Sequence, residues 1–188
     1  VVKHKGREIT FSARCIVSNA GVAKTFNQFV PPPYARAERT RVAESTPGTS
    51  AAILFLGLND DPRNHGFENC NYWIYDSDDH SSHPLGDSSV AGGFLSFGST
   101  RNPGQEPHTA QIVSFSRYDD WQEYASSDWK KRGEAYERVK QEWSEKLLSL
   151  VEKRLPGLRK LVEYQEVSSP LSVKTFTGHP RGQIYGST

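Results

Sequence analysis

The residues of this chain that could take part in chemistry gather in the run from Gly178 to Gly186, Gly-His-Pro-Arg-Gly-Gln-Ile-Tyr-Gly. A histidine, an arginine and a tyrosine stand here among glycines. Gly178 and Gly182 indicate turns that bring the backbone close to another group. Taken alone, the run is typical of a loop, and a surface cation or salt-bridge partner is the simplest role for Arg181.

A second group of polar residues is weaker as a site. Asp78, Asp79, His80 and His83 cluster in one long loop and are of types that bind metals, but nothing in the sequence fixes their geometry. We therefore predict no metal site. The sequence contains no GxGxxG, GxxxxGK[ST] or GxSxG motif, so it lacks both a phosphate-binding loop and a hydrolase nucleophile elbow. No catalytic residue is assigned.

Composition narrows the class of protein. The 188 residues carry a formal charge of +1 with 35% hydrophobic side chains, which indicates a globular protein and gives no electrostatic case for nucleic acid. No apolar run approaches the length of a membrane span. Two cysteines without metal or disulfide spacing favour a reducing compartment, and Cys15, inside an apolar run, is expected to be a buried thiol. A cytoplasmic location is predicted.

The pattern of residues predicts both strands and helices. A hairpin over residues 1–11 and a buried strand over 13–17 come first, followed by short helices over 22–30 and 34–45 around a triple proline. Aromatic and β-branched runs predict strands over 50–58, 71–75, 94–98 and 109–116. A helix capped by Ser127 is expected to continue to Leu155, since apolar residues recur at spacings of three, four and seven. A strand over 158–167 and a helix from Pro170 to Phe176 complete the list.

Because hairpin-like strands cluster in the middle and the long helix comes late, we predict an α+β fold. It has a mixed, largely antiparallel sheet with helices packed on one face.

Three blocks, in order, resemble the family of phytoene desaturases, carotenoid isomerases and retinol saturases. The first is Ile16 to Gly21, and the second runs from Tyr118 through Trp129–Lys140 to Gly157. The third joins Ser168–Leu171 to His179–Gly186, whose Pro-Arg-Gly-x-x-Tyr-Gly run is shared by the retinol saturase-like members. Together the blocks cover almost the whole chain.

The resemblance implies a fragment of a flavin-dependent oxidoreductase that saturates, desaturates or isomerises carbon–carbon double bonds of an isoprenoid or carotenoid-like substrate. Residues 1–21 would be a fringe of the flavin-binding domain, 22–177 the substrate domain, and 178–188 a segment returning toward the flavin domain. FAD would belong to the parent enzyme, and the fragment, lacking both dinucleotide signatures, is expected to bind none and to be inactive. The implied cofactor contacts in the parent are Ser18, Asn19, Ala20, Gly21, Arg181, Gly182 and Tyr185.

The partners implied are a lipophilic small molecule and the rest of the parent chain, with peripheral membrane contact as a further possibility at an apolar lip around the triple proline. The candidate substrate contacts are Phe26, Phe29, Leu54, Leu56, Tyr72, Ile74, Phe94, Phe97, Phe115 and His179. For the strand residues a plain sheet core is the alternative. Two other functions stay open: a non-catalytic lipid-binding or interaction module of the same fold, and a relative of the flavin amine oxidases. We expect His179, Arg181 and Tyr185 to be exposed or disordered in this chain.

Overall fold

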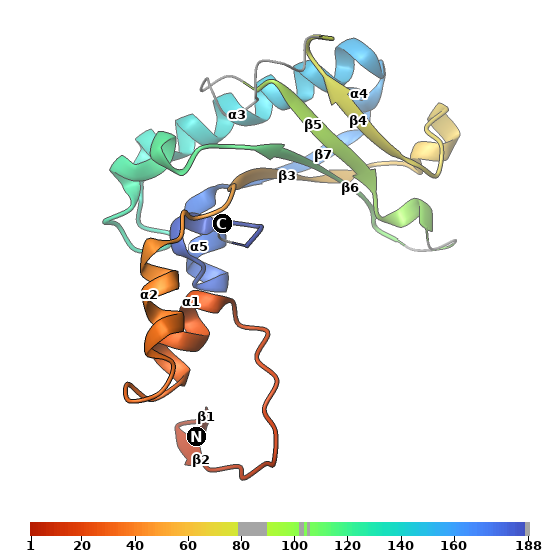
Figure 1. Cartoon of the computed structure of the whole chain (residues 1–188). Coiled ribbons are helices and arrows are strands. Elements are labelled where there is room, and N and C mark those ends of the chain that lie inside the picture. Colours follow the sequence, from red (N-terminus) through yellow and green to blue (C-terminus); the bar gives the residue numbers. More distant parts are fainter. Residues whose placement is uncertain (79–89, 102–103, 105, 187–188) are drawn as a thin grey trace. The chain divides into compact units, whose positions relative to one another are not determined.

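A computed structural model describes residues 1–78, 90–101, 104 and 106–186 (Figure 1). The chain divides into two compact units, Val1–Glu44 and Ser45–Thr188. Each unit is described by itself. The predicted assignment of the two ends of the chain to a flavin domain stays a prediction.

The first unit is built from short elements. Strands β1 (Val2–His4) and β2 (Arg7–Ile9) form the predicted antiparallel hairpin. Helix α1 (Val22–Lys24) continues into the π-helical turn η1 (Thr25–Phe29), and α2 (Arg36–Glu44) follows the prolines. The guanidinium of Arg39 donates to the carbonyl oxygens of Phe26 at 2.6 Å and Pro32 at 3.0 Å, and also to that of Val30. This side chain therefore fixes the proline turn against α2.

The predicted buried strand over residues 13–17 is wrong. These residues are extended but exposed, with Ile16 at 82% and Val17 at 91%, and Cys15 is an exposed free thiol. An apolar run becomes a buried strand only when a neighbouring strand satisfies its backbone. Within the residues that the structure describes, none pairs with this run.

The second unit contains a five-stranded sheet of order β4-β5-β6-β3-β7. Its strands are β3 (Ala51–Leu58), β4 (Asn71–Tyr75), β5 (Gly92–Phe97), β6 (His108–Phe115) and β7 (Val162–Ser168). Every neighbouring pair is antiparallel. The α+β fold and the antiparallel sheet are therefore confirmed, and the strands predicted from β-branched and aromatic runs fall close to their observed positions.

Helix α3 (Gly133–Arg154) lies across one face of this sheet (Figure 1). It begins six residues later than the Ser127 cap predicted from sequence. The backbone turns at Lys130, which adopts a left-handed φ of 65°, so the segment before Gly133 cannot continue the helix. Trp143, Leu147 and Val151 of α3 are buried against Leu54, Leu95 and Ile112 of the sheet and form the core.

The remaining helices are short. Helix α4 (Leu158–Leu161) occupies the start of the segment predicted as a strand, and α5 (Pro170–Thr177) begins at Ser169, whose hydroxyl accepts from the amides of Leu171 and Ser172. The 3₁₀ turns are η2 (Pro62–His65), η3 (Ser99–Arg101), η4 (Tyr118–Tyr124) and η5 (Pro180–Gly182).

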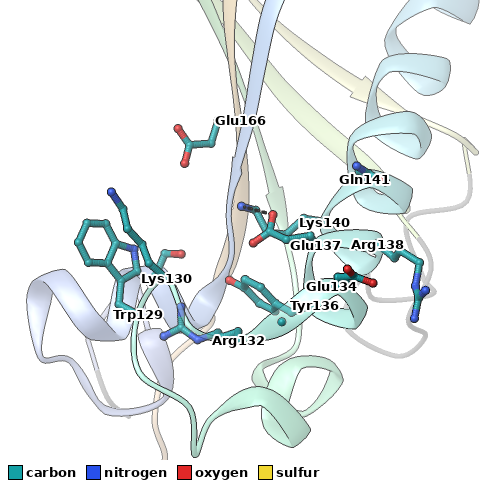
Figure 2. A pocket seen from close by; sticks show the side chains of 12 residues that line it. Trp129, Lys130, Arg132, Glu134, Tyr136, Glu137, Arg138, Lys140, Gln141 and Glu166 are labelled. Carbon is teal, nitrogen blue, oxygen red and sulfur yellow. Dashed lines mark hydrogen bonds and ion pairs between the residues drawn. The ribbon is translucent and has the colours of Figure 1, made fainter.

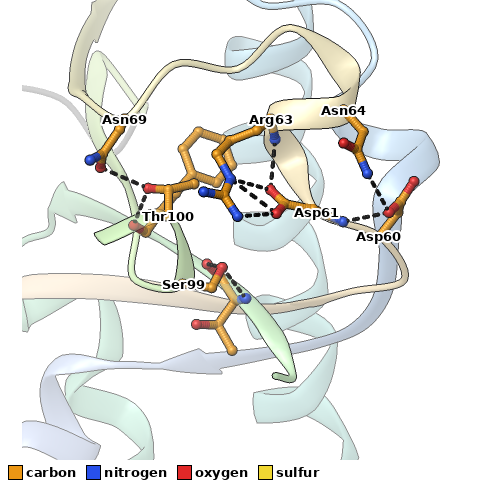
Figure 3. A network of polar contacts seen from close by, with 9 residues as sticks. Asp60, Asp61, Arg63, Asn64, Asn69, Ser99 and Thr100 are labelled. Atoms are coloured by element: carbon orange, nitrogen blue, oxygen red, sulfur yellow. Dashed lines mark hydrogen bonds and ion pairs between the residues drawn. The ribbon is translucent and has the colours of Figure 1, made fainter. Parts of the chain in front are cut away.

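A polar network fixes the connection between β3 and β4 (Figure 3). The Asp61 carboxylate accepts from the Arg63 amide and guanidinium, and the Asp60 carboxylate accepts from Asn64 at 3.1 Å and contacts His65 at 2.9 Å. The Arg63 guanidinium lowers the pKa of Asp61 to about 2. Asp60 and Asp61 are therefore turn and capping residues.

Candidate functional site

The two faces of the sheet have different surroundings. Leu54 and Phe55 are neighbours on β3. Because successive strand residues point to opposite faces, their exposed fractions show how each face of the sheet is covered. Leu54 is 0% exposed beneath α3, whereas Phe55 is 43% exposed. We call the side that carries Phe55 the open face.

The open face is rich in aromatic and β-branched side chains. Paired residues on adjacent strands share a face, so the register gathers these groups on one surface. They are Ile53, Phe55, Trp73, Tyr75, Phe94, Val113, Phe115 and Tyr164. The rings of Trp73 and Phe94 lie 4.8 Å apart, and Trp73 is 61% exposed. The exposed face of an antiparallel sheet is commonly polar, and a contiguous apolar surface marks a site of interaction.

The predicted substrate contacts fall on both faces. Phe94 and Phe115 lie on the open face, half-buried. Five others pack on the helix-covered side of the sheet, as the alternative of a plain sheet core predicted. They are Leu54, Leu56, Tyr72, Ile74 and Phe97. In the first unit Phe26 is half-buried and Phe29 is exposed. Ligand contact at all these positions stays a prediction.

Sequence reasoning passed over Phe55, Trp73, Tyr75, Val113 and Tyr164. Alternation along β3 and β4 was the signal that could have found Phe55 and Trp73, since each stands between residues that pack on the core. Tyr75 follows the buried Ile74 at the end of β4.

The run 178–186 is joined to the start of the sheet. Gln183 forms an isolated bridge with Ser50, and its side-chain oxygen accepts from the Gly48 amide at 2.9 Å. The Ile184 amide donates to the Thr49 carbonyl at 2.9 Å. Gly182 passes so close to α5 that a Cβ atom there would lie 2.0 Å from the carbonyl oxygen of Pro170. Close packing against protein therefore explains this glycine.

Arg181 also has protein partners. Its guanidinium donates to the Asp119 carboxylate at 2.7 Å and lies 4.9 Å from the centre of the Tyr118 ring. Lys174 donates to the Tyr118 hydroxyl at 3.1 Å. Arg181 and Tyr185 are exposed, as expected, while His179 is half-buried with its Nδ1 3.2 Å from the Gln183 carbonyl oxygen.

The predicted flavin contacts lie in both units of the chain, and their role in the parent protein stays a prediction. Ser18, Asn19, Ala20 and Gly21 belong to an irregular segment, where the Ser18 hydroxyl is hydrogen-bonded to that of Thr25 at 2.6 Å. Within the described chain, Gly182 packs closely against Pro170, and the Arg181 guanidinium donates to the Asp119 carboxylate.

The open face also carries polar and charged groups. Asn71 and Ser96 share this face with Phe55, and their side-chain oxygens accept from the Arg101 guanidinium. Among its described residues Glu166 is the one acidic side chain, and it accepts a hydrogen bond from Tyr164 at 3.0 Å. This hydrogen bond raises the pKa of Tyr164. The apolar part of this surface suits a hydrocarbon, and among the described residues Glu166 is the carboxylate that it could offer to an amine.

The described residues hold no cluster of three or more potential metal ligands, and Asp79, His80 and His83 lie outside the described residues. None of the helices described is long and apolar enough to span a membrane.

Comparison with known proteins supports the resemblance seen in the sequence. No family model matches the chain. Over 97% of its length the chain is 24% identical to all-trans-retinol 13,14-reductase of Danio rerio and 26% identical to that of Homo sapiens. The protein of the same name from Rattus norvegicus is 25% identical over the same share.

The chain spans 33% of the length of these relatives. The predicted resemblance to the retinol saturase and phytoene desaturase group is thus confirmed. The chain is homologous to one part of larger proteins that are named for an oxidoreductase reaction.

Proposed function

We propose that this chain forms the substrate-binding part of a flavin-dependent oxidoreductase that saturates, desaturates or isomerises a carbon–carbon double bond of an isoprenoid. The relatives named as retinol reductases favour saturation of a retinoid-like substrate. The observation that carries the proposal is the open face, where aromatic and β-branched side chains of all five strands gather without a covering helix among the described residues of the second unit.

The dimensions of the open face suit an elongated hydrocarbon. Five strands about 4.8 Å apart give a surface roughly 19 Å wide across the sheet. Binding of a polyene to the open face would be favoured by burial of the apolar surface of the polyene and of the aromatic rings that it covers. The role of this chain is then to bind the substrate, orient it and exclude water.

In such an enzyme the flavin supplies the hydride chemistry, and protein groups supply orientation and an apolar environment. The predicted contacts of Ser18–Gly21, Arg181, Gly182 and Tyr185 with the flavin stay part of this proposal, and we assign the rest of the flavin site to other parts of the parent protein. The exposed free cysteines Cys15 and Cys70 suit a reducing compartment, so the proposal includes a cytoplasmic location.

The experiment is steady-state kinetics of the parent protein with all-trans-retinol. Val113→Asp and Phe55→Asp each place a charge on the open face and are expected to lower kcat/KM by about tenfold or more, since a desolvated charge is costly. Gln122→Asp adds the same charge at an exposed position in η4 and should have no effect. Equal activity of all variants would contradict the proposal.

A different measurement distinguishes the non-catalytic binding module from the enzyme. If the chain acts as such a module, it binds a polyene tightly by itself, and quenching of its four tryptophans follows the titration. Tight binding by the chain together with an inactive parent protein would favour the module over the enzyme.

A further inference from the structure

The open face changes in polarity from one row of paired residues to the next. Residues directly opposite each other on antiparallel strands share a face, so the register defines rows that cross the sheet. One row consists of Trp73, Phe94, Val113, Ile53 and Ser168. The next row along the strands consists of Asn71, Ser96, Gln111, Phe55 and Glu166. The first row is apolar except at its β7 end, and the second is polar except at Phe55.

Arg101 joins the polar row at the side of β4 and β5. This arginine belongs to the turn η3, and its guanidinium donates to the side-chain oxygen of Asn71 and to the Ser96 hydroxyl at 3.3 Å. Ser96 is only 4% exposed. The open face therefore has a cluster of polar groups, Asn71, Ser96 and Arg101, that is held in place by hydrogen bonds.

Gln111 lies beside this cluster on β6, the central strand of the sheet. It is exposed, and its side-chain amide makes no hydrogen bond with another described residue. Its partner on one side is Ser96 and on the other Phe55, while Val113 lies two residues along the same strand. A ligand that lies over Phe55 and Val113 would therefore also cover the Gln111 amide and remove its water.

The chemistry of Gln111 favours one kind of ligand. A pure hydrocarbon would leave the donor and the acceptor of this amide unpaired, which is costly. A hydroxyl group can accept from the amide nitrogen or donate to the amide oxygen, so it satisfies either need. Arg101 and Glu166 have opposite charges on the same face, so the row has no net charge that would select an ionised group.

Another hollow of the second unit suits such a ligand less well. This groove of about 630 Å³ lies between the start of α3 and β7 (Figure 2). Acidic and basic side chains line it together, among them Glu134, Glu137, Lys130 and Lys140. A polyene in the groove would cover charged groups without pairing them, which is unfavourable.

We infer that the open face binds an isoprenoid alcohol in preference to a pure hydrocarbon, with the hydroxyl group of the ligand at Gln111 and its polyene over the row of Trp73, Phe94 and Val113. Two residues along a strand separate the rows, a distance of about 6.8 Å. An extended ligand therefore reaches the apolar row within a few bonds of its hydroxyl group. The inference rests on the proposed function, since it takes the open face as the substrate site, and it makes Gln111 a specificity-determining residue.

The test compares two ligands of the parent protein by quenching of tryptophan fluorescence. They are all-trans-retinol and the hydrocarbon in which a methyl group replaces the CH2OH group of retinol. In Gln111→Leu the dissociation constant for retinol should rise about tenfold, because the hydroxyl group loses its partner. The dissociation constant for the hydrocarbon should stay the same or fall, since leucine needs no hydrogen-bond partner.

Gln165→Leu is the matched control. Gln165 is an exposed glutamine on β7, and its pairing with Leu56 places it on the opposite face of the sheet. This variant should bind both ligands like the unchanged protein. If Gln111→Leu changed neither dissociation constant, or changed both by the same factor, the inference would be overturned. Tighter binding of all-trans-retinoic acid than of retinol would also overturn it, because the polar group would then be a carboxylate.

Phe55→Asp and Val113→Asp separate this inference from the proposed function. Both variants should weaken binding of the alcohol and of the hydrocarbon, since each places a charge beneath the ligand. If they do so while Gln111→Leu leaves the preference for the alcohol unchanged, the open face remains the substrate site and the inference about the hydroxyl group fails. If neither variant weakens binding, the inference fails together with the proposed function.

Discussion

The ring of Tyr185 lies against the ring of Phe115, with 6.4 Å between their centres. Phe115 ends strand β6 on the open face, so the run 178–186 meets the edge of the apolar surface. The motif shared with retinol saturase-like proteins and the open face are therefore parts of one region. Neither the motif nor the sheet alone would have shown this.

Gly182→Ala should be strongly destabilising. The new Cβ would meet the Pro170 carbonyl oxygen at 2.0 Å, and the residue has a φ of +58°. Gly66→Ala is the matched control, since Gly66 has a φ of +82° but open space around it. The left-handed backbone alone costs about 1–2 kcal/mol. Urea unfolding should show a distinctly larger loss of unfolding free energy for Gly182→Ala than for Gly66→Ala. Equal losses would mean that the run 178–186 moves away from Pro170 without destabilising the fold.

The neighbours Leu54 and Phe55 should respond differently to truncation. Leu54→Ala leaves a cavity beneath α3 and should lower the free energy of unfolding by about 2–5 kcal/mol. Phe55→Ala removes an exposed ring and should change it by less than about 1 kcal/mol. Thermal or urea unfolding of the two variants checks this. A larger effect at Phe55 would show that the open face is covered within this chain.

Acid should weaken the fold through the β3–β4 connection. Hydrogen bonds and charge from Arg63 hold the pKa of Asp61 in the folded state at about 2, below its ordinary value of 3.8. A depressed carboxylate pKa stabilises the fold above about pH 4, and this contribution is lost as the pH falls from about 4 toward 2. In Asp61→Asn, unfolding measured across that range should show a shallower dependence on pH. If the dependence of unfolding on pH were the same in Asp61→Asn, Asp61 would be excluded as a cause of the loss of stability in acid.

Asp119→Asn should release the run 178–186 without unfolding the chain. The Arg181–Asp119 pair is largely exposed, so its loss should cost less than about 1 kcal/mol. Hydrogen exchange at the Gln183 and Ile184 amides should nevertheless become faster, because Arg181 loses its carboxylate partner. Unchanged protection there would mean that the bridge between Gln183 and Ser50 holds the run by itself.

The elements of the sheet were predictable because their signals are local. Runs of β-branched and aromatic residues placed β3, β4, β5 and β6, and Ser169-Pro170 marked the start of α5. The start of α3 was missed because the helical spacing of Trp129 continues across a backbone turn at Lys130. The prediction for the run 13–17 was wrong because burial depends on neighbouring strands, and an apolar run does not show whether such neighbours exist.

The site was less predictable than the fold. Which face of a strand meets α3 depends on register and on the placement of the helix, so the sequence analysis named Leu54 as a substrate contact and passed over Phe55. The link between Tyr185 and Phe115 joins residues far apart along the chain. The roles of Arg181 and Gly182 depend on Asp119 and Pro170, and no spacing rule reveals those contacts.

The central claim is that the open face binds the hydrocarbon substrate. The most direct measurement is photolabelling of the parent protein with a diazirine-bearing retinoid, followed by mass-spectrometric mapping of the modified residues. Labels are expected on Phe55, Trp73, Phe94 and Val113, and excess all-trans-retinol should suppress them. Labels confined to other surfaces, or labels on these residues that excess retinol does not suppress, would contradict it.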